Sequence, residues 1–153
     1  MVGATITYAD YEAVVGKEIG VSGWIDIDQT RINTFADVTI DPQYIHVDPE
    51  AASASAFGGT IAHGFLTLSL LSAMAQQSLP TIQGTRTGVN FGFNNVRFIA
   101  PVRSGKRVRG RFVLKAVATR SPGVVQSTLA VTVEIEQEPK PALVAEWLTL
   151  AYL

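Results

Sequence analysis

The chain contains no cysteine among its 153 residues. This absence excludes disulfide frameworks, thiolate nucleophiles, iron–sulfur clusters and zinc sites built on thiolates. Charged residues are also scarce at 16%, whereas apolar residues reach 47%, which excludes an intrinsically disordered chain and predicts a large buried core. The formal net charge of −1 provides no general attraction to nucleic acid or to a membrane surface. The length fits one ordinary domain, so we expect a single domain over 1–153.

Little in the sequence could direct the chain into a membrane. The N-terminal segment lacks a basic region and carries Asp10 and Glu12 within its apolar stretch, so it is not typical of a secretory signal. The longest apolar segment, 61–79, is short for a membrane span, contains His63 and lacks flanking basic residues. It is more typical of a helix buried in a soluble domain. We therefore expect a cytoplasmic protein without membrane association.

The first half of the sequence carries helix signals. Each start combines a side chain that can cap free main-chain N–H groups with an early acid or with apolar residues at helical spacing. These signals predict a helix after Thr7, one over 31–38 capped by Thr30, one after Asp48, and one long buried helix over 61–79.

The second half changes to the two-residue period of strands. Apolar side chains alternate with polar ones, which is typical of strands with one buried face. The predicted strands cover 92–98, 107–116, 129–136 and 142–152, with a turn at Ser121-Pro122-Gly123 and a short earlier strand over 23–28. Together these elements predict an α+β fold in which one buried helix lies against an antiparallel sheet.

Acidic residues are missing from a long part of the chain. No Asp or Glu occurs in 51–133, a span that holds nine of the twelve basic residues. One hypothesis is that the basic residues form the solvated face of a sheet. The other is a positive rim that attracts a phosphorylated ligand or an acidic carrier protein. Nucleic acid is disfavoured, because the segment has no interleaved aromatic residues and no recognition motif. The cluster contains Arg97, Arg103, Lys106, Arg107, Arg109 and Arg111.

Asp41 and His46 form the first candidate for chemistry. They are five positions apart, so on a helix or a strand their side chains would point apart. They can converge only in an irregular loop, and Pro42 blocks a regular helix there. Such a pair can give and take protons, although a turn-forming Asp41 and a buried structural His46 would also explain the pattern.

His63-Gly64 stands at the start of the long apolar segment. Free N–H groups at a helix start suit a developing negative charge on oxygen, and glycine allows a ligand to approach the main chain. The alternative is that Gly64 only allows close packing and that His63 only packs at the helix end. The histidine spacing matches no familiar metal motif, and no G-x-S-x-G is present, so we expect neither a metal site nor a serine hydrolase.

Three ordered blocks of the sequence resemble the MaoC-like dehydratases. They are Phe35-Ala36-(x)4-Asp41-(x)-Gln43-(x)2-His46-(x)-Asp48-Pro49, then Ile61-Ala62-His63-Gly64-Phe65, then Asn90-(x)-Gly92-(x)3-Val96-Arg97-Phe98-(x)2-Pro101-Val102. Within that family the chain is most similar to the nodulation-protein-N-type group and its (R)-specific enoyl-CoA hydratases, from about Thr5 to the C-terminus. It departs at Ile40, where many members have glycine, and at Gln43-Tyr44, where the longer hydratases usually have Asn-Pro.

The resemblance implies a hot-dog fold, with the sheet wrapped around one long helix, and a homodimer whose active sites lie near the subunit interface. The implied reaction is reversible syn hydration of a trans-2-enoyl thioester to an (R)-3-hydroxyacyl thioester. The substrate is a CoA or acyl-carrier thioester, and no metal or redox cofactor takes part. His46 would activate water, Asp41 would exchange the proton at the α carbon, and the Gly64 N–H would bind the thioester oxygen. Hydration requires Asp41 to start protonated, which in turn requires a buried carboxyl group.

Further residues are candidates for contact with the substrate. The resemblance implies that Gln43 orients the catalytic pair or the water, and the basic cluster supplies side chains for the charged end of the substrate. The substrate-binding candidates are Gln43, His63, Asn90, Arg97, Arg103 and Arg107. The alternative functions are an acyl-CoA thioesterase, because hot-dog folds also support thioester hydrolysis, and a non-catalytic acyl-thioester-binding subunit.

Overall fold

A six-stranded antiparallel sheet forms the body of the computed structural model, which describes residues 4–153. The strand order is β2-β6-β7-β8-β5, and β3 pairs with β6 beside β2. A separate parallel pair joins β1 to β4. The strands are β1 (Thr5–Ile6), β2 (Glu18–Val21), β3 (Ile25–Ile27), β4 (Thr81–Ile82), β5 (Thr87–Phe98), β6 (Lys106–Ser121), β7 (Val124–Ile135) and β8 (Leu143–Tyr152). Residues 1–3, the start of the predicted domain and N-terminal segment, lie outside the described residues.

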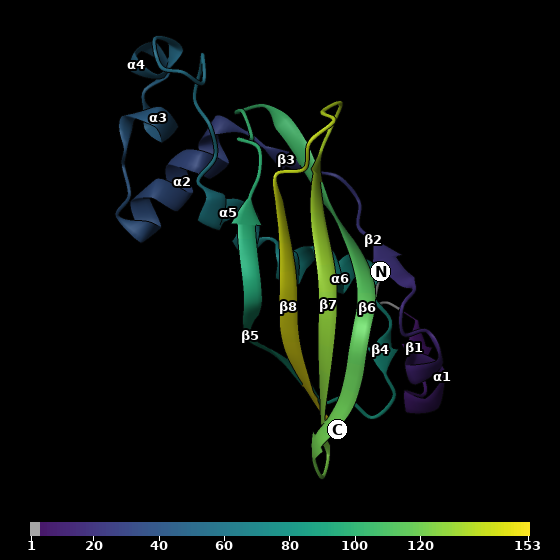
Figure 1. Ribbon diagram of the computed structural model, residues 1–153. Coiled ribbons are helices and arrows are strands. Elements are labelled where there is room, and N and C mark those ends of the chain that lie inside the picture. Colours follow the sequence, from purple (N-terminus) through teal and green to yellow (C-terminus); the bar gives the residue numbers. More distant parts are fainter. Residues whose placement is uncertain (1–3) are drawn as a thin grey trace.

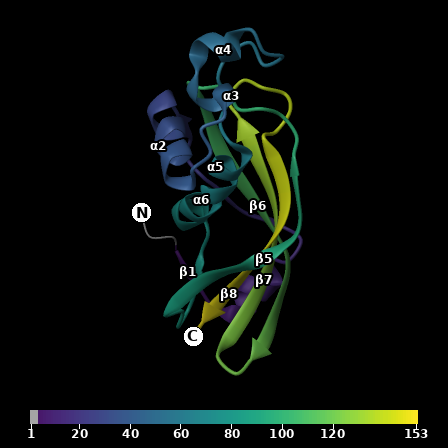
Figure 2. The same cartoon turned by 90° about the vertical axis from the view of Figure 1, so that its left-hand side faces the viewer.

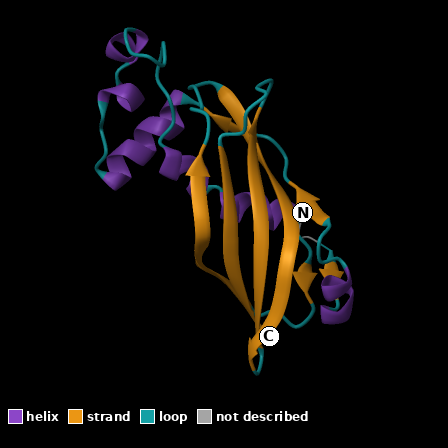
Figure 3. Ribbon diagram, viewed as in Figure 1, coloured by secondary structure: helices purple, strands orange, loops and turns teal. Residues whose placement is uncertain are grey.

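The helices are α1 (Tyr8–Ala13), α2 (Gln29–Thr39), α3 (Tyr44–Val47), α4 (Pro49–Ser53), α5 (Gly64–Ser69) and α6 (Leu71–Ser78). The sheet curves, and three of the helices, α2, α5 and α6, lie on one side of it (Figure 2). Helix α6 lies behind the middle of the sheet, whereas α2, α3 and α4 gather at one end of it (Figures 1 and 3). This arrangement confirms the predicted α+β class and the hot-dog fold.

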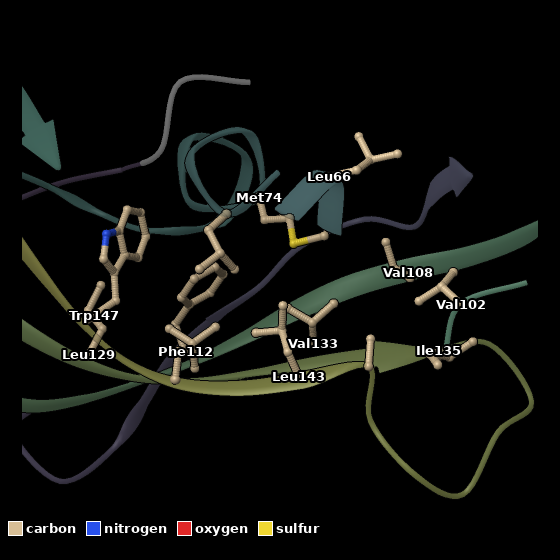
Figure 4. Packing of buried hydrophobic residues seen from close by; sticks show 14 of the residues in the cluster. Leu66, Met74, Val102, Val108, Phe112, Leu129, Val133, Ile135, Leu143 and Trp147 are labelled. Carbon is tan, nitrogen blue, oxygen red and sulfur yellow. The ribbon is translucent and has the colours of Figure 1, made fainter. Parts of the chain in front are cut away.

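The core lies between α6 and the concave face of the sheet. Met74 of α6 and Phe112 of β6 are both fully buried and point toward one another (Figure 4). A Cβ atom at Gly110 would lie 2.9 Å from the Phe112 ring and 3.0 Å from Met74 Sδ, which is too close for a side chain. Glycine at this position therefore lets the helix pack directly on β6.

The helix starts follow the capping rules, with one correction. Thr7 caps α1 and Asp48 caps α4, as the sequence predicts. The predicted cap at Thr30 is wrong, because the Asp28 carboxylate accepts the Arg31 N–H at 2.8 Å and α2 begins two residues earlier. A carboxylate at the N-cap satisfies a free N–H and also favours the positive end of the helix dipole.

The single long helix predicted over 61–79 is instead two helices, α5 and α6, that meet at Leu70. The Ser69 hydroxyl donates to the Leu66 carbonyl at 2.7 Å, and the Leu70 N–H bonds to the Thr67 carbonyl three residues back. Side-chain competition for carbonyls and bonds of this shorter span interrupt a regular α-helix. No helix within residues 4–153 is both long and apolar enough to cross a bilayer.

The four long strands confirm the predicted ones. Strands β5, β6 and β7 begin earlier than predicted, β6 also ends later, and β8 matches to within one residue, while the strand expected over 23–28 shortens to β3. One burial prediction in β6 is wrong. The ladder shifts by one residue between Leu114 and Ala116, so Ala116 is exposed and Val117 packs against the core instead. Such a bulge reverses the phase of the side-chain alternation, which the sequence pattern alone does not reveal.

Helix α2 ends in a left-handed turn at Ile40. The residue has φ of 57° and ψ of 43°, a conformation that β-branched residues rarely adopt because the side chain crowds the main chain. Its side chain is 89% exposed, so packing within the chain offsets little of this strain. Because of this turn, the Asp41 N–H donates a hydrogen bond to the Ala36 carbonyl oxygen at 3.0 Å, which sets the position of Asp41.

Replacing Ile40 by glycine should therefore stabilise the fold. Relief of about 1–2 kcal/mol of left-handed strain exceeds the roughly 0.5–1 kcal/mol of entropy that glycine adds to the unfolded chain. We expect Ile40→Gly to raise the free energy of unfolding in urea by about 0.5–1 kcal/mol. The control is Val38→Gly, an exposed position inside α2, which should lower it by about 1 kcal/mol. Equal destabilisation by both variants would contradict the strain at Ile40.

Candidate active site

The loop between α2 and α3 brings Asp41 close to His46. After the turn at Ile40 the chain passes through Pro42 and re-enters a helix, with the His46 N–H bonded to the Gln43 carbonyl at 2.9 Å. The predicted irregular loop is confirmed. Because the chain reverses here, two residues that would diverge on a regular element face one region.

His46 is buried with one defined proton. The residue is 7% exposed, and its Nδ1 lies 2.7 Å from the Ile61 carbonyl oxygen. A carbonyl can only accept, so Nδ1 carries the proton and Nε2 keeps a lone pair that can accept one. Burial lowers the pKa of His46 below its ordinary value of 6.5, and the nearby His63 lowers it further. The hydrogen bond to Ile61 and the charge of Asp41 raise this pKa but do not offset the effect of burial. His46 is therefore a neutral base at pH 7.

His63 joins the two parts of this site. Its ring stacks on that of His46 with centroids 3.7 Å apart and planes 24° apart. Its Nε2 lies 3.0 Å from the Asp41 carbonyl oxygen, to which it donates, and 4.0 Å from Asp41 Oδ2. The ring of Phe35, from α2, also packs against His63, with the two ring centroids 5.0 Å apart. His63, which is 3% exposed, thus holds the main chain of Asp41 beside His46.

Three side chains offer potential ligand or proton-transfer atoms close together. One such atom from each of Asp41, His46 and His63 lies within 4.8 Å of the others. Two hydrogen bonds of about 2.8 Å span up to roughly 5.6 Å, so one water molecule can contact both Asp41 and His46. The same atoms are also close enough to surround a divalent ion, since an imidazole that donates one N–H to a carbonyl keeps its other nitrogen as a ligand. That the site works without a metal stays a prediction.

A cavity of about 400 Å³ opens beside His46. Its walls are mainly apolar, which suits an uncharged chain. Gly64, the first residue of α5, lies on the wall with an N–H that has no partner in its own helix. Among residues 4–153 no other group accepts this N–H. The lining includes His46, Phe57, Gly64, Phe65, Phe98 and Val102.

Packing against Phe98 requires glycine at position 64, in addition to the role expected for its N–H. A Cβ atom at this position would lie 2.8 Å from the ring of Phe98, which is itself in the cavity wall. Both hypotheses for this glycine therefore apply to the same residue. A larger side chain would push the Phe98 ring and block the approach of a ligand to the N–H.

Asp41 departs from the expectation of a buried carboxyl group. Its side chain is 53% exposed, and it does not line the cavity that His46 lines. About half of the Asp41 side chain is therefore open to solvent in the single chain. His46 lines the cavity, whereas the expected burial of the Asp41 carboxyl group is not found within one chain.

The sequence did not point to Gln29, which supports His46 from α2. Gln29 Nε2 donates to the His46 carbonyl at 2.7 Å, and its Oε1 accepts the Thr60 hydroxyl at 2.6 Å. This network ties α2, α3 and the segment before α5 together. No local motif marks either residue, because they lie 31 positions apart and meet only in the fold.

Three predicted substrate contacts lie away from the cavity. Gln43 is exposed at the start of α3, and Arg97 is exposed on β5. Asn90 bonds to Ser72 at 3.2 Å and lines a different cavity, of about 230 Å³, between α6 and strands β5 and β8. The predicted contact role of His63 also changes, since its ring lies behind the cavity wall rather than in it.

Arg107 is a correction to the predicted positive rim. It lies on the outer face of β6 and binds Glu136, the first residue after β7, through two hydrogen bonds, which lower the pKa of Glu136. Arg109 and Arg111 share Glu134 in the same way. Although 51–133 contains no acid, the next strand supplies the carboxylates. Arg107, Arg109 and Arg111 are therefore neutralised by carboxylates on neighbouring segments, as the hypothesis of a solvated sheet face predicts.

Residues 10–135 match the MaoC like domain family. Nodulation protein N of Rhizobium meliloti (strain 1021) is 53% identical over 147 residues, which cover 95% of this chain and 91% of that protein. 3-Hydroxyacyl-thioester dehydratase Z of Mycobacterium tuberculosis (strain ATCC 25618 / H37Rv) is 49% identical over 138 residues, covering 90% and 91%. The solved structure of the (R)-hydratase from A. caviae involved in PHA biosynthesis matches with a TM-score of 0.73 at 25% identity, covering 88% of this chain and 94% of that one. Because the domain match covers most of the chain and these relatives align over nearly its whole length, the protein belongs to the MaoC-like dehydratase family.

Proposed function

We propose that this protein is an (R)-specific enoyl thioester hydratase that also catalyses the reverse dehydration of 3-hydroxyacyl thioesters. The observation that carries the proposal is the neutral His46 base, held within 4.8 Å of the Asp41 carboxylate beside an apolar cavity. Membership of the family makes the chain a hydro-lyase. The names of its relatives, a 3-hydroxyacyl-thioester dehydratase and an (R)-hydratase, support the substrate class and the stereochemistry.

The proposed reaction adds water across the double bond in a syn manner. His46 Nε2 accepts a proton from water while the water oxygen bonds to the β carbon, and protonated Asp41 donates its proton to the α carbon. Negative charge builds up on the thioester oxygen between these events, and the Gly64 N–H stabilises it. In the proposed arrangement both transfers occur on one face of the double bond. No metal or redox cofactor is needed.

The proposed enzyme is a homodimer, because the single chain leaves both the site and an edge of the sheet uncovered. β5 is an edge strand of 12 residues that exposes Phe91 and Phe93. Near the cavity, Phe65 is 68% exposed, and the Asp41 side chain is 53% exposed. An exposed edge strand with apolar side chains is a surface for association. A second copy on this side would shield the Asp41 carboxyl group from solvent.

The two alternative functions make different use of the same residues. In a thioesterase the water activated by His46 would attack the thioester carbonyl and release free thiol. A non-catalytic binding subunit would have no use for a neutral base beside a carboxylic acid. The partners in the proposed function are an acyl thioester and a second copy of the chain, with no nucleic acid and no membrane. The cytoplasmic location stays a prediction from the sequence.

Asp41→Asn and His46→Gln should each lower kcat by about 10²–10⁴-fold, because each removes one of the two proton-transfer groups. The measurement is the loss of enoyl absorbance when purified protein acts on crotonyl-CoA and longer enoyl-CoAs. Unfolding curves should stay close to those of the wild type, which serves as the control for folding. Near-normal turnover in either variant, or release of free thiol without loss of the enoyl group, contradicts the proposal.

Two His63 variants separate a positioning role from contact with substrate. His63→Leu removes the hydrogen bond to the Asp41 carbonyl and leaves an apolar side chain in a buried position. We expect kcat to fall about 10- to 100-fold with little change in KM. His63→Gln keeps an N–H donor near the Nε2 position and should recover most of the lost rate. A raised KM with unchanged kcat would instead favour direct contact between His63 and the substrate.

The pH profile of kcat/KM should reflect the lowered pKa of His46. Because burial favours the neutral ring, His46 stays a base as the pH falls through 6.5, and the acidic decline should be centred below that value. The unfolded chain takes up this proton more readily than the folded one, so the fold should also lose stability as the pH falls below 6.5. A decline of kcat/KM centred above pH 6.5 would contradict His46 as the base.

A further inference from the structure

A groove of about 200 Å³ lies next to the active-site cavity and shares Ala100 and Pro101 with its wall. It runs between the segment before β6 and the loop that joins β7 to β8. Figure 1 shows this loop at the same end of the sheet as α2, α3 and α4. The charged residues in its lining are Arg103, Lys106, Lys140 and Glu138, which amounts to three cations and one carboxylate.

The cations of this groove differ in their pairing. Lys106 binds Glu138 at 3.0 Å, so these two charges cancel. Arg103 and Lys140 have no carboxylate within 4.0 Å among residues 4–153 and are exposed. On β6, in contrast, Arg107 already binds Glu136. Two positive charges beside the cavity are therefore free to bind an anion, whereas those on the sheet face are not.

Both free cations line the groove that adjoins the active-site cavity. Arg103 forms a β-bridge with Ile61, a residue of the cavity wall. Its guanidinium lies over Gly58, where Nη2 would be 3.3 Å from a Cβ atom, and the next residue back, Phe57, lines the cavity. Lys140 stands between Pro139 and Pro141, whose rings restrict the main chain of the loop.

We propose that Arg103 and Lys140 bind the phosphate groups of a pantetheine thioester substrate, while its acyl part reaches the cavity. This inference rests on the proposed function for the identity of the ligand. Arginine and lysine are the side chains that proteins commonly use to bind phosphate, arginine through its planar fork of donors and lysine as a point charge. The pantetheine arm itself carries no charge. It therefore fits the apolar wall of Ala100 and Pro101 that the charged groove shares with the cavity. Binding at the remote phosphates positions the reacting carbons without taking part in the chemistry.

The affinity of the full chain for CoA tests this directly and needs no turnover. By titration calorimetry at low salt, Arg103→Gln and Lys140→Gln should each weaken CoA binding about three- to fivefold, and the double variant about tenfold. Arg103→Lys keeps the charge and should bind more tightly than Arg103→Gln. Arg107→Gln is the matched control and should bind as the wild type does. The differences should shrink in about 0.5 M salt.

Wild-type affinity in the double variant, or an equal loss in Arg107→Gln, would overturn the assignment. If wild-type protein hydrates no thioester but CoA binding still follows the expected pattern, the proposed function fails and the phosphate site stands. If the wild-type protein hydrates the thioester but the double variant binds CoA as tightly as the wild type, the phosphate site fails and the proposed function stands.

Three thioesters separate the sources of phosphate. Enoyl groups on CoA, on a carrier protein and on N-acetylcysteamine share the reacting atoms, but the last has no phosphate. A higher KM in the double variant with CoA alone assigns the site to the nucleotide phosphates. A higher KM with both CoA and carrier protein assigns it to the phosphate next to the pantetheine arm. A higher KM with N-acetylcysteamine as well would show a structural defect and overturn the proposal.

Discussion

The hydrogen bond from His63 Nε2 to the Asp41 carbonyl oxygen joins the two segments on which the active site depends. The loop that carries Asp41 and His46 is irregular and contributes few packed side chains of its own. His63 stacks on His46 and thereby places the start of α5 against that loop. Since both imidazoles use one nitrogen on a main-chain carbonyl, their orientations are set by groups that side-chain substitution cannot remove. The ring of His46 is left with one basic nitrogen.

The same constraint explains why the cavity lies at the start of α5. The close packing of Met74 and Gly110 holds α6 on the sheet, and α5 continues from it toward the loop. The first residue of α5, Gly64, is thus brought to His46 with a free N–H. Proton transfer and stabilisation of negative charge require groups from distant parts of the chain, and the helix on the sheet is the rigid link between them.

The distribution of charge shows how pairing across strands changes the meaning of a sequence cluster. Arg107 and Arg109 are close in sequence to Arg103, yet they bind Glu136 and Glu134 at the end of β7 and have no free charge. Arg103 precedes the strand, where the ladder has not begun, and Lys140 follows β7 in a loop. Cations that lie beyond the ends of the strands escape neutralisation, and the ends of the strands are where the cavity opens.

The sequence by itself determined the fold class and the identity of the central residues. Alternating apolar positions specify the strands, the caps at Thr7 and Asp48 specify helix starts, and the three family blocks single out Asp41, His46 and Gly64. These signals are local, because periodicity and capping act between residues a few positions apart. Recognition of the family blocks adds the expected chemistry.

Only the tertiary structure decided what these residues touch. It made Gln29 and Thr60 partners, moved Asn90 to another cavity, paired Arg107 with Glu136 and left Asp41 half-exposed. Each of these outcomes depends on a contact between positions far apart in the chain or on a surface left uncovered. Local spacing carries no information on such contacts, since they arise from strand register, from bulges and from the packing of helices on the sheet.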